Sequence, residues 1–416
     1  MSSDKPFPIT KSMVWKAYKL VERYGKAAGV DGQSMEDFAN DLTNNLYKLW
    51  NRMASGSYFP PPVRRVEIPK ASGGVRPLGI PTVADRVAQM VVKQFLEPEL
   101  EPVFDPDSYG YRPGKSAHQA VEVARKRCWE YDWVVDLDIK AFFDSIDHEL
   151  LMRAIRCHTQ ERWVLLYLER WLKAPVQLPD GTLQDRLSGT PQGGVISPLL
   201  ANLFLHYAFD AWMRRSYPSI PFERYADDAI CHCRTREQAE QLKVSLEKRF
   251  AQCGLRLHPE KTHVVYCKTS SRRDQHPHIQ FTFLGFTFRP RKSKDRYGEV
   301  FTNFLPAVSQ QALKRMRLKI KQMNLRKQAF LPLEVIARRL NPILRGWIQF
   351  YGRFYPSELR AKLFTYLNKR LCSWLREKHK PLRGRYLRSR QVLARIARQC
   401  PDLFIHWQRG GGIMVG

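Results

Sequence analysis

Phe222-Glu223-Arg224-Tyr225-Ala226-Asp227-Asp228-Ala229-Ile230-Cys231 places two adjacent carboxylates between short apolar runs. Strand-forming residues on both sides of an acidic turn predict a β-hairpin with Asp227 and Asp228 at its tip. Like charges in contact repel, so such a tip suggests a bound cation, and hard carboxylate oxygens favour Mg²⁺. A solvated Asp-Asp turn also fits this stretch taken alone. The metal site therefore requires a further acid from elsewhere in the chain.

A second acidic stretch, Trp-Val-Val-Asp-Leu-Asp-Ile-Lys-Ala-Phe-Phe-Asp at 133–144, supplies that acid. Its period of two puts the apolar residues on one face of a strand and Asp136 and Asp138 on the other. Asp138 is nearer to the carboxyl end of the strand, where it can meet Asp227 and Asp228. Three carboxylates in one place can hold two metal ions, which is the arrangement used for in-line phosphoryl transfer.

These two stretches resemble the palm motifs of reverse transcriptases. Tyr225-Ala226-Asp227-Asp228 resembles the active-site motif of that family, and Asp138 followed five residues later by Phe143 resembles its first palm motif. The resemblance implies that Asp138, Asp227 and Asp228 are catalytic and bind two Mg²⁺ ions, with Mn²⁺ as an alternative. It also implies that the ring of Phe143 lies where a ribose 2′-hydroxyl would go, and so excludes ribonucleotides.

A basic hairpin precedes the acidic strands. Two alternating stretches, 63–70 and 75–81, flank a glycine turn and bring Lys70 and Arg76 near one another. Cations so placed can grip a triphosphate, Arg by its fork and Lys as a point charge. A solvated basic hairpin is the alternative. The resemblance implies the first role, because the matching Lys and Arg of the family hold the incoming dNTP.

Two further motifs complete the predicted site. Gly189-Thr190-Pro191-Gln192-Gly193-Gly194 is followed by Ser197 and Pro198, a good N-cap and first helical residue, which predict a helix to about Ser216. The stretch closely resembles the fourth motif of group II intron reverse transcriptases, which implies that Gln192 and Gly193 line the dNTP pocket. Lys261 matches the lysine of motif D, a candidate for protonating the leaving pyrophosphate. A solvated charge at a strand end is the alternative for Lys261.

Composition favours a polyanionic partner. The 416 residues carry a net charge of +29, and residues 301–416 hold 25 Lys and Arg against 4 Asp and Glu, a net charge of +21. No stretch of 18 apolar residues or signal peptide is present, so nucleic acid is a better partner than a membrane. The 8 cysteines show no paired spacing and suggest reduced thiols in a cytosolic protein. The resemblance to group II intron reverse transcriptases of bacterial type implies the bacterial cytoplasm or nucleoid.

The last third reads as basic helices, predicted at about 313–327, 332–351 and 357–379. Residues 340–351 closely resemble the maturase thumb, also called the X domain. We therefore expect an α+β right-hand polymerase fold. Fingers and palm with an antiparallel sheet occupy 1–300, including an N-terminal extension to about 60. A helical thumb occupies 301–380, and a basic nucleic-acid-binding segment occupies 381–416.

The motifs occur in family order and predict an RNA-directed DNA polymerase of a group II intron that also acts as splicing maturase. Its partners would be intron RNA, a DNA target and primer, and dNTPs, in support of intron mobility by target-primed reverse transcription. Nothing after Gln399 resembles the HNH endonuclease of many relatives. The alternatives are a domesticated or defence-associated relative acting on other RNA, a maturase without polymerisation, and a metal-dependent nuclease. The presence of Asp138, Asp227 and Asp228 disfavours a maturase without polymerisation. The Pro-Gln-Gly motif disfavours a metal-dependent nuclease, which would not need it.

Overall fold

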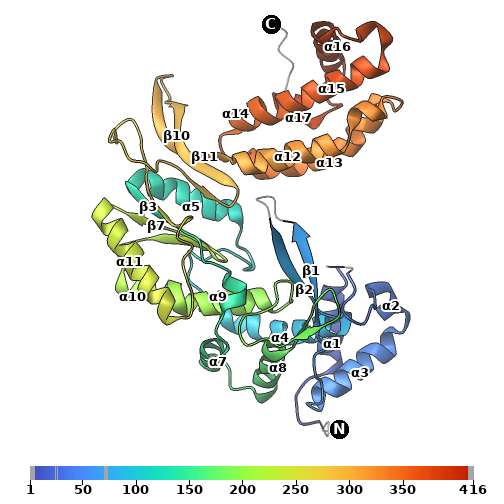
Figure 1. Ribbon diagram of the computed structural model, residues 1–416, viewed down its shortest axis with the longest axis vertical. Helices are drawn as coiled ribbons and strands as arrows, with labels where there is room; N and C mark the ends of the chain where they lie inside the picture. Colours follow the sequence, from blue (N-terminus) through green and yellow to red (C-terminus); the bar gives the residue numbers. More distant parts are fainter. Residues whose placement is uncertain (1–4, 24, 26, 70–73, 411–416) are drawn as a thin grey trace. The chain divides into compact units, whose positions relative to one another are not determined.

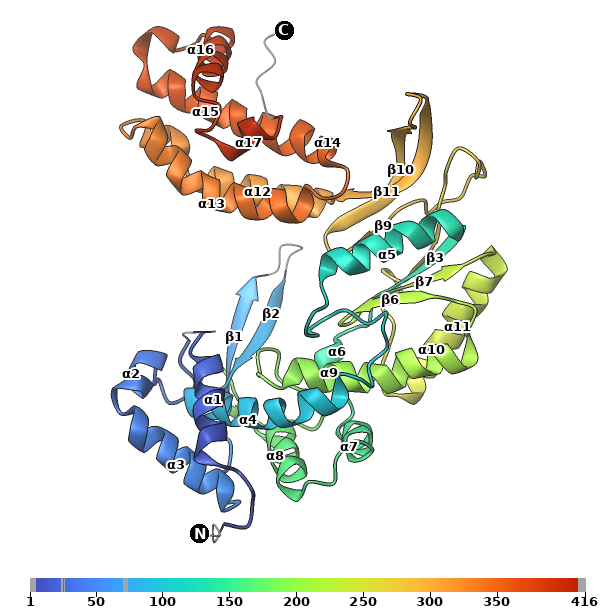
Figure 2. The same cartoon turned by 180° about the vertical axis from the view of Figure 1, so that it is seen from behind.

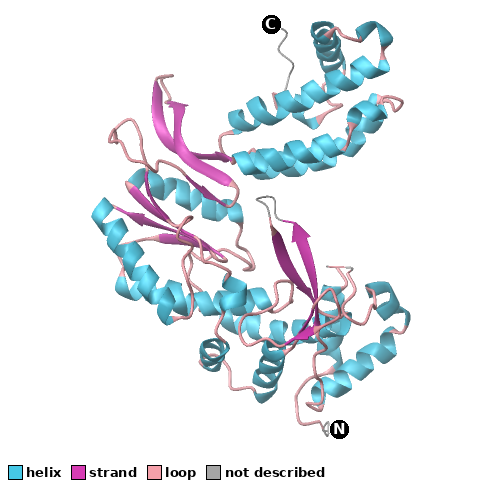
Figure 3. Cartoon of the chain, viewed as in Figure 1, coloured by secondary structure: helices cyan, strands magenta, loops and turns pink. Residues whose placement is uncertain are grey.

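The computed structural model describes residues 5–23, 25, 27–69 and 74–410 (Figure 1). The chain forms two compact units, one of residues 1–120 and 134–264 and the other of residues 121–133 and 265–416. Helices and strands are mixed along the chain, in agreement with the α+β class (Figure 3). The larger segment of the second unit starts at residue 265, whereas the sequence suggested a boundary at 301. None of the described helices is long and apolar enough to cross a membrane.

The first unit begins with helices that pack on one another. Helix α1 packs against α3 and α4; the bounds are α1 Lys11–Val21, α2 Met35–Asn40, α3 Leu42–Ala54 and α4 Val83–Leu100. The side chain of Thr82 starts α4 by accepting a hydrogen bond from the backbone N–H of Asp85. The helix continues past Pro98 to Leu100. Pro98 stands in the last turn, where it removes one intrahelical hydrogen bond without ending the helix.

The predicted basic hairpin forms part of a four-stranded sheet of order β2-β1-β4-β5. The bounds are β1 Val63–Pro69, β2 Val75–Ile80, β4 Val176–Gln177 and β5 Leu183–Gln184. Strands β1 and β2 are antiparallel, and Ile68 lies opposite Arg76. Lys70 lies outside the described residues.

A second four-stranded sheet, of order β6-β7-β3-β8, carries the acids. Its bounds are β3 Trp133–Leu137, β6 Phe222–Tyr225, β7 Asp228–Cys233 and β8 His263–Tyr266. Val135 and Leu137 are buried, as the alternating pattern predicted. Helix α11 (Arg236–Gln252) packs on β7. The remaining helices between the strands are α6 Phe142–Ser145, α7 His148–Arg156 and α8 Arg162–Lys173.

The helix predicted from Ser197 to about Ser216 is present, with two differences. Ile196 rather than Ser197 is the N-cap, and the Ser197 hydroxyl instead accepts a hydrogen bond from the Thr190 hydroxyl at 2.8 Å. The helix is also interrupted by a π turn, which the sequence did not indicate; its parts are α9 Ser197–Leu205, the π turn His206–Asp210 and α10 Ala211–Ser216.

The second unit combines a three-stranded antiparallel sheet with a helical bundle. The sheet has the order β11-β10-β9, with bounds β9 Phe281–Phe283, β10 Phe286–Lys294 and β11 Val300–Val308. Helix α5 (Ala117–Glu130) begins in the first unit and continues into the second. The bundle helices α12, α13 and α15 lie side by side (Figure 2); they are α12 Gln310–Gln322, α13 Leu333–Tyr351, α14 Pro356–Leu359, a π turn Arg360–Phe364 and α15 Thr365–Lys378.

The bundle does not end near residue 380. Helices α16 (Tyr386–Gln399) and α17 (Ile405–Gln408) follow, and α16 packs on α15. Leu393 and Phe404 belong to the same buried cluster as Leu340 of α13 and Leu371 of α15. The residues that the sequence assigned to a separate basic segment therefore bury an apolar face in the bundle, and their exposed face carries the charge.

Candidate active site

The two adjacent acids occupy the tip of a tight hairpin, as the sequence predicted. Tyr225 of β6 pairs with Asp228 of β7, so only Ala226 and Asp227 form the turn. Ala226 has a φ of 56°, a left-handed conformation that residues other than glycine rarely adopt. A positive φ at the first of two central residues matches the right-handed twist of the flanking strands. The turn therefore sets the directions of Asp227 and Asp228 relative to each other.

Asp138 directly follows β3, where the chain is held by bonds to the segment 258–262. Its carbonyl oxygen accepts a hydrogen bond from the backbone N–H of His258 at 2.7 Å. Its carboxylate accepts from Lys261 Nζ, with 2.6 Å between Nζ and Oδ2. The structure thus brings Lys261 to the first palm acid, although the side chain of Lys261 is 61% exposed.

The charges of these residues act on one another. Burial and the negative charges of Asp227 and Asp138 raise the pKa of Asp228 to about 7, while Lys261 and Arg76 oppose that shift. Burial raises the pKa of Asp227 as well, against the positive charge of Arg76. On β3, burial and the charges of Asp228 and Asp138 raise the pKa of Asp136. Repulsion among carboxylates is the condition that a bound cation relieves.

The donor set suits a divalent cation by its chemistry, because carboxylate oxygens are the ligands that hard cations prefer. Within the described residues, however, no three Asp, Glu, His or Cys side chains converge closely enough to hold a metal ion. The ammonium group of Lys261 occupies one oxygen of Asp138 and supplies positive charge there. A metal ion at this place would have to displace that ammonium group from Oδ2.

The loop predicted to line the dNTP pocket is held against β2. The carbonyl oxygen of Gln192 accepts a hydrogen bond from the backbone N–H of Gly79 at 2.8 Å. Gly193 has a φ of 121°, and a Cβ atom there would lie 2.6 Å from the carbonyl oxygen of Gly79. Glycine is therefore required at 193 both by backbone conformation and by space. The loop also borders a cavity of about 470 Å³ whose lining includes Asp144 and Arg65 but none of the three acids.

Phe143 lies against the same loop. Its carbonyl oxygen accepts a hydrogen bond from the backbone N–H of Thr190 at 2.8 Å, and its side chain is 9% exposed. The ring packs edge-on against Phe142, with 5.6 Å between ring centroids. The first palm motif and the Pro-Gln-Gly loop are thus joined directly through the backbone.

Sequence reasoning missed a buried network that supports this loop. Gln89 of α4 accepts hydrogen bonds from the backbone N–H of Val195 at 2.8 Å and of Ile196 at 3.3 Å. Its amide nitrogen donates to Asp85 at 3.0 Å. Asp85 also accepts from the Tyr58 hydroxyl and the Trp171 indole N–H, at 2.8 and 2.6 Å. An Asp and a Gln four residues apart, on the helix face that also carries the apolar Val92 and Leu96, were the signal available in the sequence.

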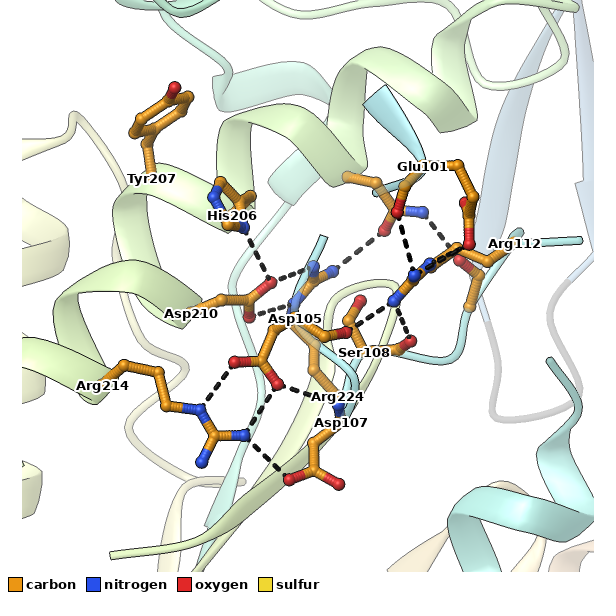
Figure 4. A network of polar contacts seen from close by, with 12 residues as sticks. Glu101, Asp105, Asp107, Ser108, Arg112, His206, Tyr207, Asp210, Arg214 and Arg224 are labelled. Carbon is orange, nitrogen blue, oxygen red and sulfur yellow. Dashed lines mark hydrogen bonds and ion pairs between the residues drawn. The ribbon is translucent and has the colours of Figure 1, made fainter. Parts of the chain in front are cut away.

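Arg224, two residues before the acidic turn, was also missed as a functional residue. Its guanidinium pairs with Asp210 rather than with Asp227 or Asp228 (Figure 4). Arg224 lies within residues 222–231, near the acidic pair, and this position was the signal available in the sequence. Its partner lies in the π turn, which local propensity does not reveal.

Comparison with known proteins identifies two families in this sequence. Residues 68–288, more than half of the chain, match the model of the family described as reverse transcriptase (RNA-dependent DNA polymerase). Residues 313–393 match the maturase-specific domain of group II introns.

Three individual relatives show the extent of the similarity. Protein YkfC of Escherichia coli is 31% identical over 310 residues, which are 65% of this chain and 78% of that protein. Group II intron-encoded protein LtrA of Lactococcus lactis is 38% identical over 174 residues, 41% of this chain and 29% of LtrA. Nuclear intron maturase 1, mitochondrial, of Arabidopsis thaliana is 31% identical over 93 residues, 22% of this chain and 13% of that protein. The match thus spans most of YkfC but less than a third of LtrA. A family match over more than half of its length, with a maturase-specific match after it, makes this chain a member of the reverse transcriptases of group II intron type.

Proposed function

We propose that the protein extends a DNA primer along an RNA template and that its own template is group II intron RNA, whose splicing it assists. The observation that carries the proposal is that burial and the charge of Asp138 raise the pKa of both Asp227 and Asp228, which lie near the cations Arg76 and Lys261. Carboxylates that repel one another beside basic side chains mark a site that works with bound cations.

Each residue of the site has a proposed role. Asp138, Asp227 and Asp228 would hold two Mg²⁺ ions, and Mn²⁺ would substitute. Bound there, the ions supply the positive charge that stabilises the attacking and leaving oxygens. Lys70 and Arg76 would bind the triphosphate. Gln192 and Gly193 would contact the nucleotide, Phe143 would exclude its 2′-hydroxyl, and Lys261 would protonate the pyrophosphate after leaving Asp138.

The basic bundle of the second unit is the proposed binding surface for intron RNA and target DNA. The maturase-specific match lies within it, and the relatives carry names of intron-encoded proteins and an intron maturase. Most of the net positive charge of the chain also lies in residues 301–416. Neutralisation of phosphates by such a surface releases counterions and drives binding.

Primer extension tests the proposal directly. Purified protein with Mg²⁺ and dNTPs should extend a DNA primer on an RNA template, and Asp227→Ala should abolish extension because the site loses one of its three anionic donors. Extension should also cease on removal of the metal with EDTA and return on addition of Mg²⁺. Appreciable extension by the Asp227→Ala variant would remove Asp227 from the site.

A further inference from the structure

The side chain of Arg224 is buried directly behind the acidic turn and is 1% exposed. Its Nε and Nη2 donate to the two carboxylate oxygens of Asp210 at 2.7 and 2.6 Å (Figure 4). Its Nη1 donates to Oδ1 of Asn202 at 2.9 Å and to the carbonyl oxygen of Ala226 at 3.1 Å. One guanidinium therefore connects a helix to the peptide that immediately precedes Asp227.

The bond to Ala226 acts at the strained point of the turn. Ala226 adopts its left-handed φ of 56° without the freedom of glycine. Such a conformation persists only where the surroundings determine it. The Nη1 bond fixes the orientation of the Ala226 carbonyl group and so of the peptide that carries Asp227.

Asn202 holds the other side of the same turn. Its Nδ2 donates to the carbonyl oxygen of Gly110 at 2.7 Å. Gly110 lies so close to the turn that a Cβ atom there would clash with the backbone nitrogen of Ala226. The Tyr109 backbone N–H also donates to the Arg224 carbonyl oxygen at 2.8 Å. Arg224 and Gly110 thus enclose the turn from two sides, and Asn202 bonds to both.

The π turn explains how Asn202 and Asp210 reach one guanidinium. Eight residues of a regular α-helix make about 2.2 turns, which would place the two side chains about 80° apart. A π turn accommodates one extra residue, so the spacing is equivalent to about seven residues, or nearly two full turns. The His206–Asp210 π turn therefore brings both side chains to the same face of the helix.

A second arginine stabilises the π turn from outside. Arg249 of α11 donates from Nε to the carbonyl oxygen of Ala208 at 3.0 Å and from Nη2 to that of Tyr207 at 2.9 Å. These carbonyl groups lie in the segment where the regular hydrogen-bond pattern changes. The irregular turn is thus supported by partners rather than left unsatisfied.

We propose that Arg224 is a positioning residue of the polymerase site: anchored by Asp210 and Asn202 on the π-turn helix, it sets the orientation of the turn that carries Asp227 and Asp228. The inference rests on the proposed polymerase function. A lysine at 224 would keep the charge but lacks the fork needed to bond Asp210, Asn202 and Ala226 together. Loss of these bonds should reorient the acids without removing them.

The decisive comparison is Arg224→Lys against Arg214→Lys. Arg214 stands on α10 and is 40% exposed, and its ion pairs are with Asp105 at 2.6 Å and Asp107 at 2.9 Å rather than with the acidic turn (Figure 4). We expect Arg224→Lys to lower kcat for primer extension about 10- to 100-fold, because small displacements of reacting groups have effects of that size. KM for dNTP and Kd for primer-template should change less than about threefold. Arg214→Lys should change kcat less than about threefold.

A measurement without turnover separates positioning from general damage. Binding of Mn²⁺ alone, followed by electron paramagnetic resonance, should be several-fold weaker in Arg224→Lys than in the parent and unchanged in Arg214→Lys. Asn202→Ala, which keeps the Arg224–Asp210 pair, should lower kcat in the same sense by a smaller factor. It is the variant to use if Arg224→Lys does not remain folded in circular dichroism at the assay temperature.

The outcomes distinguish the two proposals. A parent protein that neither binds Mn²⁺ nor extends primers would overturn the polymerase function and this inference with it. An active parent whose kcat and Mn²⁺ affinity are the same in Arg224→Lys would overturn only the positioning role. Equal losses in Arg224→Lys and Arg214→Lys would do so too, because they would trace the effect to the helix as a whole.

Discussion

At the scale of single residues, Phe143 offers the sharpest test of the nucleotide pocket. Its backbone is bonded to the Pro-Gln-Gly loop and its ring is largely buried. If the ring excludes a ribose 2′-hydroxyl, Phe143→Ala should raise rNTP incorporation relative to dNTP incorporation, measured as the ratio of kcat/KM values. Removal of a buried phenylalanine also destabilises a protein by about 3 to 5 kcal/mol.

The neighbouring ring provides the matched control for that prediction. Phe142 is 2% exposed and packs against Phe143. Phe142→Ala should lower the melting temperature to a similar extent but leave the sugar preference unchanged. Unaltered discrimination in Phe143→Ala, or the same alteration in both variants, would show that Phe143 is a core residue and no sugar gate.

At the scale of elements, Asp85 joins α4 to α8 and, through Gln89, to the Pro-Gln-Gly loop. Burial raises the pKa of Asp85 from 3.8 to about 6, although hydrogen bonds from Tyr58, Trp171 and Gln89 favour its charged form. The folded protein therefore holds a proton that the unfolded chain releases between pH 4 and 6. The contribution of this group to stability is full below pH 4, declines as pH rises to 6 and is then constant.

Asp85→Asn should remove that pH dependence. The free energy of unfolding of the parent, relative to the variant, should fall by about 1 kcal/mol between pH 5 and pH 7.5. Denaturant unfolding of both proteins at the two pH values, followed through the cooperative transition of the first unit, measures this difference. A difference that is constant with pH, or that increases with pH, would contradict the raised pKa.

Local sequence patterns predicted some of these elements and not others. The period of two located β3 and the acidic hairpin, and apolar periodicity located α12, α13 and α15, because these signals are local. The π turn at His206–Asp210 and the hydrogen-bond partners of Asp85 could not be predicted. They depend on partners far apart in the chain, such as Arg249 for the π turn and Trp171 for Asp85. The packing of α16 and α17 on the bundle was missed for a related reason: basic residues dominate this part of the sequence, while few apolar residues are buried.

In the molecule as a whole, the candidate catalytic acids and most of the net positive charge lie in different parts of the chain. The candidate catalytic acids lie between residues 138 and 228, whereas residues 301–416 carry +21 of the net charge of +29. Asp227→Asn combined with Asp228→Asn should therefore leave RNA binding intact. The double variant should still bind intron RNA and assist its splicing while making no cDNA.

The converse variant tests the charged surface. Arg383, Arg385 and Arg388 are exposed on the outer side of the bundle, and their replacement by Ala leaves the buried residues of α16 in place. Each cation that no longer neutralises a phosphate makes the negative slope of log K against log salt shallower by about 0.7 to 0.9, so removal of all three should make it shallower by about 2. RNA binding at several salt concentrations measures that slope, and extension of a saturating primer-template should be largely retained.

A control variant must distinguish the effect of total net charge on RNA binding from the effect of where that charge lies. Lys16, Lys48 and Lys248 are exposed cations of the first unit, and their replacement by Ala removes the same total charge. If the bundle is the RNA-binding surface, this control should bind with nearly the parental salt slope, because long-range effects of exposed charges are screened at physiological salt. Equal weakening of RNA binding in both triple variants would mean that the affinity depends on the total charge of the protein. A parental slope in the Arg383, Arg385 and Arg388 variant would place the phosphate-binding cations elsewhere on the chain.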